Sequence, residues 1–331
     1  MDEQMWALGY DRTVDVWEQS RGLRKVRVDR PTLDEACNPL DAEAAIIRVI
    51  YSGFCGSDRG IWFREAFRDM IHHSLDAESK STRILGHEML GEIVEVGGIT
   101  ASRYGFRPGD TVTTESHITC GKCYQCQIGD SHVCSDEKII GFSLDGCFAE
   151  YVKLPARVLW RTDTERILPH VASVQEPFGN AVHVCSTVDL RGRSLAIFGC
   201  GTIGMFVILA ARALGAAHII GIEPNPINAE KARHLGADEV VSLPSREHPW
   251  HSNPEVVHTV RRFGGDGVDV AMEMSGYNSS LNNAIQSTRR GGSVVLFGLK
   301  TGDFTIQDYT DLIHNGITLR GVFGRRVFHT W

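Results

Sequence analysis

The pattern of apolar and polar positions changes once along the chain, near Val171. Before that point, short segments alternate between apolar and polar residues, and turns containing glycine or proline separate them. This pattern predicts an irregular, mostly antiparallel β domain over residues 1–170. A charged, weakly helical segment at 64–83 interrupts it, and its adjacent His72 and His73 are more typical of a solvated helix face than of a metal site. The predicted strands are 26–28, 45–50, 91–96, 110–113 and 148–152.

From residue 171 to residue 331, helix-length apolar segments alternate with short β-branched runs. Six of these runs are spaced for helical crossovers, which predicts a doubly wound parallel sheet and an α/β fold class for the chain. The most apolar stretch, 203–220, is interrupted by Arg212, Gly215 and His218, so a strand–helix–strand interpretation explains it better than a membrane span. The six predicted strands are 195–198, 218–222, 239–241, 268–271, 293–297 and 317–322.

The first strand of this second domain leads directly into a glycine-rich turn at 199–204, followed by a predicted helix at 205–214. Such a turn permits close approach of a pyrophosphate and points a helix N-terminus at it, although the same motif also occurs as a simple tight turn. Glu223 closes the next strand nineteen residues after Gly204, where its carboxylate can accept hydrogen bonds from ribose hydroxyls and repel a 2′-phosphate. We therefore predict NAD rather than NADP. The predicted cofactor-binding residues of the turn are Gly199, Gly201, Thr202, Ile203 and Gly204.

Four cysteines lie within fifteen residues, at Cys120, Cys123, Cys126 and Cys134. This spacing lets a short loop wrap one tetrahedral metal, and four thiolates indicate structural zinc in a lobe at about 117–136. Two disulfides or an iron–sulfur cluster are the alternatives, and the absence of an export signal and of other cluster-type spacing disfavours them. Such a site is coordinatively closed, so any chemistry has to occur elsewhere.

A second set of potential metal ligands is scattered through the first domain. Cys55 lies in Gly-Phe-Cys-Gly-Ser-Asp, His87 and Glu88 are adjacent, and Glu176 lies near the domain junction. Thiolate, imidazole and carboxylate suit zinc with one position left open. Taken singly, each residue also fits a structural role, as a buried thiol, a core histidine or a helix-terminal acid.

Composition and charge narrow the class of partner. The 331 residues are 42% hydrophobic and carry a net charge of −7, and no basic run is present that could neutralise several phosphates. We therefore expect a small neutral or zwitterionic substrate and no nucleic acid. The acidic N-terminus is not followed by an apolar signal segment, which predicts a reducing cytoplasmic location and no membrane segment.

The order of these motifs resembles that of the zinc-dependent medium-chain dehydrogenase/reductase family from about Ala44 onward. Within that family the chain is most similar to the L-threonine 3-dehydrogenases. The segments that carry this similarity are 117–120, 176–183, 267–276 and 324–331. The resemblance implies a GroES-like catalytic domain, a Rossmann cofactor domain, NAD, one structural zinc and one catalytic zinc.

The resemblance also implies roles for individual residues. The catalytic zinc would be held by Cys55, His87 and either Glu88 or Glu176, and would polarise a substrate hydroxyl while carbon delivers hydride to NAD. Ser57 matches the hydroxyl that passes the alcohol proton outward. His117 matches a histidine that lines the threonine pocket. Arg325 or Arg326 would contact either a substrate carboxylate or the cofactor pyrophosphate.

Three departures from the family pattern are present, of which the first bears on the outer part of the proton relay and the second on substrate choice. Gly60 stands where threonine dehydrogenases commonly carry a histidine, and the interval from Cys55 to His87 is longer than usual, which predicts an extra loop at the mouth of the cleft. Family chains also continue beyond the point where this one stops, at Trp331, so we expect their C-terminal segment to be missing.

The leading functional interpretation is oxidation of L-threonine to 2-amino-3-oxobutanoate by a homo-oligomer. The alternatives are a polyol or aminocyclitol dehydrogenase of the same family and a truncated, non-catalytic zinc protein.

Overall fold

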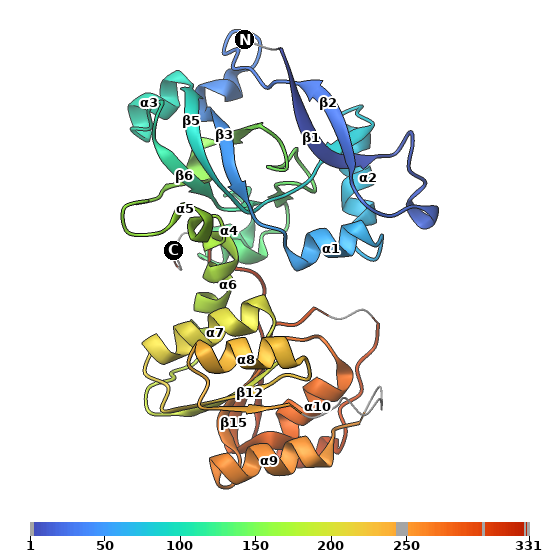
Figure 1. Cartoon of the computed structure of the whole chain (residues 1–331), viewed down its shortest axis with the longest axis vertical. Helices are drawn as coiled ribbons and strands as arrows, with labels where there is room; N and C mark the ends of the chain where they lie inside the picture. Colours follow the sequence, from blue (N-terminus) through green and yellow to red (C-terminus); the bar gives the residue numbers. More distant parts are fainter. Residues whose placement is uncertain (1–2, 243–250, 300–301, 328, 330–331) are drawn as a thin grey trace. The chain divides into compact units, whose positions relative to one another are not determined.

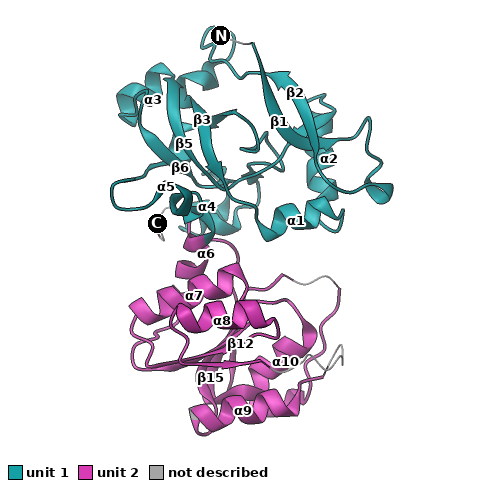
Figure 2. Ribbon diagram, viewed as in Figure 1, with its two compact units in different colours: residues 1–177 teal, residues 178–331 magenta. Residues whose placement is uncertain are grey.

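The computed structural model describes residues 3–242, 251–299, 302–327 and 329. The chain forms two compact units, Met1–Pro177 and Phe178–Trp331 (Figures 1 and 2). Helix α6, Gln175–Ser186, begins in the first unit and ends in the second. Among the described residues, none of the helices is long and apolar enough to cross a membrane.

The first unit contains antiparallel sheets of three, five and two strands. The three-stranded sheet has the order β2 (Arg24–Asp29), β1 (Gln4–Asp11) and β4 (Thr82–Ile84). The five-stranded sheet has the order β10 (Leu159–Arg161), β6 (Thr111–Thr114), β5 (Met89–Val96), β3 (Ala44–Ser52) and β9 (Tyr151–Pro155). The smallest sheet pairs β7 (His117–Ile118) with β8 (Lys138–Ile139).

Short helices connect these strands. The α-helices are α1 (Gly56–Trp62), α2 (Arg68–Ala77), α3 (Gly98–Arg103), α4 (Tyr124–Gln127) and α5 (Pro169–Ala172). Turns of 3-10 helix occupy Trp17–Gln19, Pro39–Glu43, Ser131–Val133 and Ala156–Val158.

Helix α2 lies within the long interval between Cys55 and His87, and its apolar face is buried. Ile71 and Leu75 of this helix belong to one core cluster with Tyr10 and Trp17. The ring of His72 stacks on Tyr10, with Nε2 3.1 Å from the tyrosine hydroxyl oxygen. The expectation of a solvated histidine face therefore holds for the exposed His73 and not for His72, which packs against aromatic side chains.

The second unit is built on a six-stranded parallel sheet in the order β13-β12-β11-β14-β15-β16, which confirms the predicted doubly wound fold. The strand order reverses between β11 and β14, which is where such sheets bind ligands. The strands are β11 (Ser194–Phe198), β12 (His218–Ile222), β13 (Glu239–Val241), β14 (Val268–Glu273), β15 (Thr288–Leu296) and β16 (Thr318–Gly321).

Helices cover both faces of this sheet (Figure 1). Along β11, Leu195 and Ile197 pack in one core cluster while Ala196 and Phe198 pack in another, as the two-residue period of a strand buried on both faces requires. The first cluster includes residues of α7 (Thr202–Ala213) and α8 (Pro226–His234). The second includes residues of α9 (Pro254–Gly264), α10 (Asn278–Ser287) and α11 (Tyr309–His314).

Candidate metal centres and cofactor site

The four cysteines of the predicted lobe lie together. All four are free, and their sulfur atoms lie within 4.8 Å of one another. Backbone N–H groups point at these sulfurs: Cys120 donates to Cys134 Sγ at 3.3 Å, and Cys123 donates to Cys120 Sγ at 3.3 Å. Such donors stabilise the thiolate form, which is the form that binds metal.

The pKa values of two of these thiols are shifted in opposite directions. Hydrogen bonds from the backbone N–H groups of Cys126 and Ser135 lower the pKa of Cys123 to about 6, whereas burial raises the pKa of Cys134 to about 12. Four sulfurs this close cannot all ionise without a positive charge between them, and a tetrahedral tetrathiolate set is the closed arrangement of structural zinc.

A second group of ligand atoms comes from two loops of the five-stranded sheet. Cys55 Sγ, a ring nitrogen of His87 and a carboxylate oxygen of Glu88 lie within 4.8 Å of one another, and we call this group the Cys55 site. Cys55 is the N-cap residue of α1, just after β3, while His87 and Glu88 immediately precede β5. Because Ser52 at the end of β3 pairs with Met89 at the start of β5, the two loops emerge side by side.

The carboxylate of Asp58 lies close to residues of both loops. Its Oδ2 accepts a hydrogen bond from the Cys55 N–H at 2.9 Å, and its Oδ1 lies 3.7 Å from His87 Nδ1. The side chain is fully buried, and burial raises its pKa to about 7. In the sequence, Asp58 could have been found from its position three residues after Cys55, which is the N3 position of a capping box. Its proximity to His87 is visible only in the fold.

Glu176 is a further buried carboxylate of the first unit. It lies in the first turn of α6, and its Oε1 accepts a hydrogen bond from Ser116 Oγ at 2.5 Å. Burial, and after it the negative charge of Glu88, raises the pKa of Glu176 to about 8. Among the described residues, the group within 4.8 Å contains Glu88 and not Glu176.

The donors of the Cys55 site fit a divalent cation of zinc type. Burial, with a further contribution from the charge of Glu88, raises the pKa of the Cys55 thiol to about 12. Burying a thiol, an imidazole and carboxylates together is costly unless a cation compensates the negative charge. Thiolate, imidazole and carboxylate are also the ligands of a catalytic zinc that keeps one position open.

The two predicted catalytic side chains, Ser57 and His117, occupy different elements of the same unit. Ser57 Oγ lies 3.5 Å from Cys55 Sγ in the first turn of α1. His117 lies in β7, and its Nδ1 is 2.8 Å from Glu137 Oε2. The backbone N–H of His117 donates a hydrogen bond to Glu115 Oε1 at 3.1 Å. Glu137 therefore orients the imidazole, a pairing that sequence spacing alone does not reveal.

In the second unit, the glycine-rich turn joins β11 to α7. Gly199 has φ of +100°, and a Cβ at Gly204 would lie 2.0 Å from the Gly199 carbonyl oxygen, so both positions require glycine. A Cβ at Gly201, the N-cap residue of α7, would meet no atom within 4 Å. Thr202 and Ile203 follow as the first residues of the helix, and the open space beside Gly201 suits a ligand phosphate.

Two buried carboxylates organise the loops around this turn. Glu223 follows β12 and accepts hydrogen bonds from the Cys200 N–H at 2.9 Å and the Asn225 N–H at 2.8 Å. Glu273, at the end of β14, accepts from the backbone N–H groups of Ser275 and Gly276 at 2.8 and 3.0 Å. Glu273 was not among the predicted site residues, because its position beside the turn depends on the pairing of β11 with β14.

The predicted cofactor or substrate arginine, Arg325, is buried, with 1% of its surface exposed. Its Nη1 donates to Asn180 Oδ1 at 3.3 Å, and His183 Nδ1 lies 2.9 Å from the Gly324 carbonyl oxygen. Both partners belong to α6, so this helix holds the 324–325 segment in place within the second unit.

Comparisons with known proteins match both halves of the chain. Residues 41–164 match the alcohol dehydrogenase GroES-like domain, and residues 202–331 match the zinc-binding dehydrogenase family. The L-threonine 3-dehydrogenase of Pyrococcus abyssi is 38% identical over 289 residues, which cover 86% of this chain and 77% of that protein. The L-threonine 3-dehydrogenase of Caldanaerobacter subterraneus subsp. tengcongensis is 35% identical over 291 residues, covering 87% and 78%. Among solved structures, 2R,3R-butanediol dehydrogenase from Bacillus subtilis has a TM-score of 0.81 at 27% identity, covering 98% of this chain and 85% of that one.

Proposed function

This chain belongs to the zinc-dependent medium-chain dehydrogenase family and is an NAD-linked alcohol dehydrogenase, and from that premise we propose that its substrate is L-threonine. The proposed reaction oxidises the hydroxyl carbon to give 2-amino-3-oxobutanoate. Hydride leaves that carbon for the nicotinamide ring, and the hydroxyl proton leaves to solvent. The observation that carries the proposal is the 35–38% identity to L-threonine 3-dehydrogenases over about 86% of the chain.

The first unit offers residues suited to each part of that reaction. Cys55, His87 and either Glu88 or Glu176 would hold a zinc ion, which would supply a Lewis acid that lowers the pKa of the substrate hydroxyl. In this proposal Ser57, whose Oγ lies 3.5 Å from Cys55 Sγ, passes the hydroxyl proton outward. The imidazole of His117, oriented by Glu137, lines the substrate pocket in this proposal.

The second unit offers the cofactor site. Gly199, Gly201 and Gly204 shape the turn, Thr202 and Ile203 present the first amides of α7, and Glu223 lies after β12 where ribose hydroxyls bind in such folds. The carboxylate of Glu223 favours NAD over NADP, since it would repel a 2′-phosphate. We assign Arg325 to the same site as a pyrophosphate or substrate contact.

A second candidate substrate class is a polyol or other diol. Its support is the structural similarity to 2R,3R-butanediol dehydrogenase, together with Gly60 at the position where threonine dehydrogenases commonly carry a histidine. A diol lacks the ammonium and carboxylate groups of threonine, so the two classes differ in the charges that the pocket has to bind.

A substrate panel tests the proposal. The purified enzyme would be assayed with NAD and L-threonine, 2R,3R-butanediol or sorbitol, by following NADH absorbance. We expect the highest kcat/KM with L-threonine. Strong turnover of a diol with none of threonine would instead assign the protein to the second class.

A further inference from the structure

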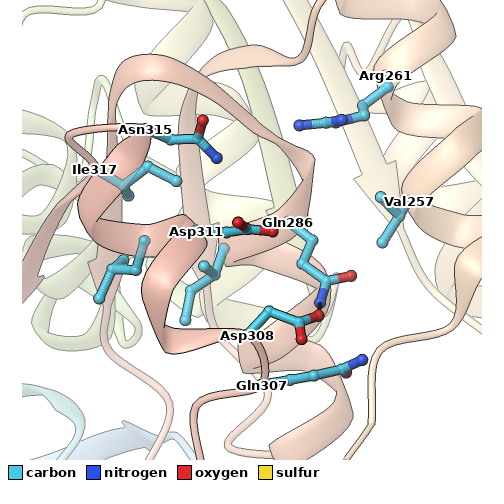
Figure 3. Close-up of a pocket in the computed structure, with 10 residues that line it drawn as sticks. Val257, Arg261, Gln286, Gln307, Asp308, Asp311, Asn315 and Ile317 are labelled. Atoms are coloured by element: carbon cyan, nitrogen blue, oxygen red, sulfur yellow. Dashed lines mark hydrogen bonds between the residues drawn. The ribbon is translucent and has the colours of Figure 1, made fainter.

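The second unit contains a cavity that the proposed dehydrogenase reaction does not use. None of its lining residues belongs to the glycine-rich turn. The cavity has a volume of about 180 Å³ and is formed by α9, the last turn of α10, α11 and the segments just before and just after α11 (Figure 3). Its apolar floor consists of Val257, Ile285, Leu312 and Ile317. Its polar wall consists of Arg261, Gln286, Gln307, Asp308, Asp311 and Asn315.

Arg261 is the central feature of this cavity. Its Nε is buried, and among the residues that the structure describes the guanidinium has neither a hydrogen bond nor an ion pair. A buried guanidinium N–H without a partner loses its hydration with no compensation, which is uncommon in folded proteins. Figure 3 shows Arg261 and the Asn315 amide pointing toward one another across the cavity.

The cavity also carries negative charge that Arg261 does not neutralise. Asp308 and Asp311 line it, and both residues are exposed, so it can be reached from solvent. Asp308 is held in the left-handed conformation, with φ of +53°, which is unusual for a residue other than glycine and recurs at ligand sites. A cation and two anions thus face one small cavity without forming an ion pair with each other among the described residues.

The rest of the polar wall is fixed by hydrogen bonds. Ser252, just before α9, donates through Oγ to Gln286 Oε1 at 2.7 Å and through its backbone N–H to Gln307 Oε1 at 2.9 Å. Gln286 Nε2 in turn donates to Asp308 Oδ2 at 3.4 Å. Asn282 of α10 accepts the Gln307 N–H at 2.9 Å. The glutamines are therefore held in place, and Arg261, Asp311 and Asn315 remain available to a ligand.

We propose that this cavity binds a small zwitterionic amino acid, at a site separate from the dehydrogenase substrate site. The ligand carboxylate would pair with the Arg261 guanidinium and the Asn315 amide, its ammonium group with Asp311 and Asp308, and a short side chain would contact the apolar floor. A simple anion would be repelled by the two aspartates, and a simple cation would be repelled by Arg261. Only a molecule with both charges satisfies all of them.

Calorimetric titration of the full chain with L-alanine tests the proposal, because L-alanine carries both charges and has no hydroxyl to oxidise. Propionate and ethylamine serve as probes that each carry one of the two charges. We expect saturable binding of one L-alanine per chain, and binding of either half-ligand that is weaker by about tenfold or more.

Two variants locate the site. Arg261→Gln and Asp311→Asn should each weaken L-alanine binding by about tenfold or more, since each removes one charge-assisted contact. Arg262→Gln is the matched control, because Arg262 is exposed on the same helix and lies over the Phe263 ring. Its affinity should equal that of the wild type. Asp311 is exposed, so Asp311→Asn keeps the test valid if Arg261→Gln does not fold.

Three results would overturn the proposal. Absence of saturable L-alanine binding would do so, and so would propionate or ethylamine binding as tightly as L-alanine. Undiminished binding in both variants would place the amino acid elsewhere, including the substrate site of the dehydrogenase. None of these results bears on whether L-threonine is oxidised.

Discussion

At Gly53, the lack of a side chain leaves room for the Glu88 carboxylate. A Cβ there would lie 2.0 Å from Glu88 Oε2 and 3.0 Å from Glu88 Cβ. We predict that Gly53→Ala displaces this carboxylate and lowers kcat by about 10–100-fold, the range seen when groups that position a metal ligand are changed. Zinc analysis and turnover would measure the effect. Gly56→Ala is the control, since a Cβ at Gly56 meets nothing within 4 Å; equal losses in both variants would refute the steric explanation.

Glu223 combines two roles, and two different measurements on one variant separate them. We propose that its carboxylate binds the ribose hydroxyls, and it also accepts hydrogen bonds from the Cys200 and Asn225 N–H groups. We predict that Glu223→Ala narrows the preference for NAD over NADP by removing charge repulsion. Leaving those two backbone donors without an acceptor should also destabilise the protein by about 1–3 kcal/mol for each. The kcat/KM ratio for the two cofactors and a denaturant titration measure these effects. Higher wild-type efficiency with NADP would contradict the assignment.

Metal-ligating residues could be predicted from the sequence where the ligands of one site lie close together along the chain. The four thiols of the lobe and the adjacent His87 and Glu88 are of this kind, and the structure brings each set together. Asp58 and Glu137 were not predicted, because each contacts a loop that is distant in the sequence. Glu273 was not predicted, because its position beside the glycine-rich turn depends on the pairing of β11 with β14. The same reason kept the choice between Glu88 and Glu176 open.

In the turn between β11 and α7, two glycine substitutions should distinguish a packing role from a cofactor-binding role. A Cβ at Gly204 would collide with the Gly199 carbonyl oxygen, whereas a Cβ at Gly201 would enter open space. We predict that Gly204→Ala lowers both the melting temperature and NAD affinity. Gly201→Ala should lower NAD affinity while changing the melting temperature little, because the added methyl group meets only the incoming phosphates.

Thermal unfolding without NAD, followed by NAD titration, distinguishes the two glycine effects. If Gly201→Ala bound NAD with wild-type affinity, the pyrophosphate could not lie against this residue. If Gly204→Ala kept its stability, the close packing of α7 on β11 would not depend on glycine.

Strand prediction succeeded or failed according to how each strand is buried. The inner parallel strands of the second unit, such as β11 and β12, are apolar on both faces, so their runs are conspicuous. Strands β12 and β13 have the predicted bounds. Strand β1 was missed because its exposed face carries Trp6 and Leu8, which hides the alternation of buried and exposed positions. The predicted strand at 148–152 is displaced: β9 begins at Tyr151, and Phe148 instead bonds to Leu8 of β1.

On the scale of the whole molecule, the two-domain α/β architecture and the family were both accessible from sequence, since each depends on the order of local motifs. The cavity at Arg261 was not. Its charged residues come from α9, α11 and the preceding loop, and they share a site only because these helices cover the same face of the parallel sheet. A binding site assembled across helix packing leaves no contiguous motif to recognise.

The two metal centres should differ in what they contribute to the whole chain. We propose that the thiol lobe is a closed zinc site, of the kind that stabilises a fold, and that the Cys55 site would keep a position for substrate. We predict about two zinc ions per chain in the wild type and about one in either Cys123→Ser or Cys55→Ser. Cys123→Ser should lower the melting temperature markedly. Cys55→Ser should abolish turnover while NAD affinity stays near that of the wild type, because the glycine-rich turn belongs to the other unit.

Elemental analysis, thermal unfolding and NAD titration of the three proteins decide between one metal centre and two. We expect the Cys123→Ser variant to lose thermal stability and the Cys55→Ser variant to lose turnover. If the wild type held about one zinc per chain and Cys123→Ser lost all of it, the Cys55 site would not hold zinc in the purified protein. If Cys55→Ser retained most of its turnover, the proposed Lewis-acid role of a metal at this site would be wrong, however many ions were bound.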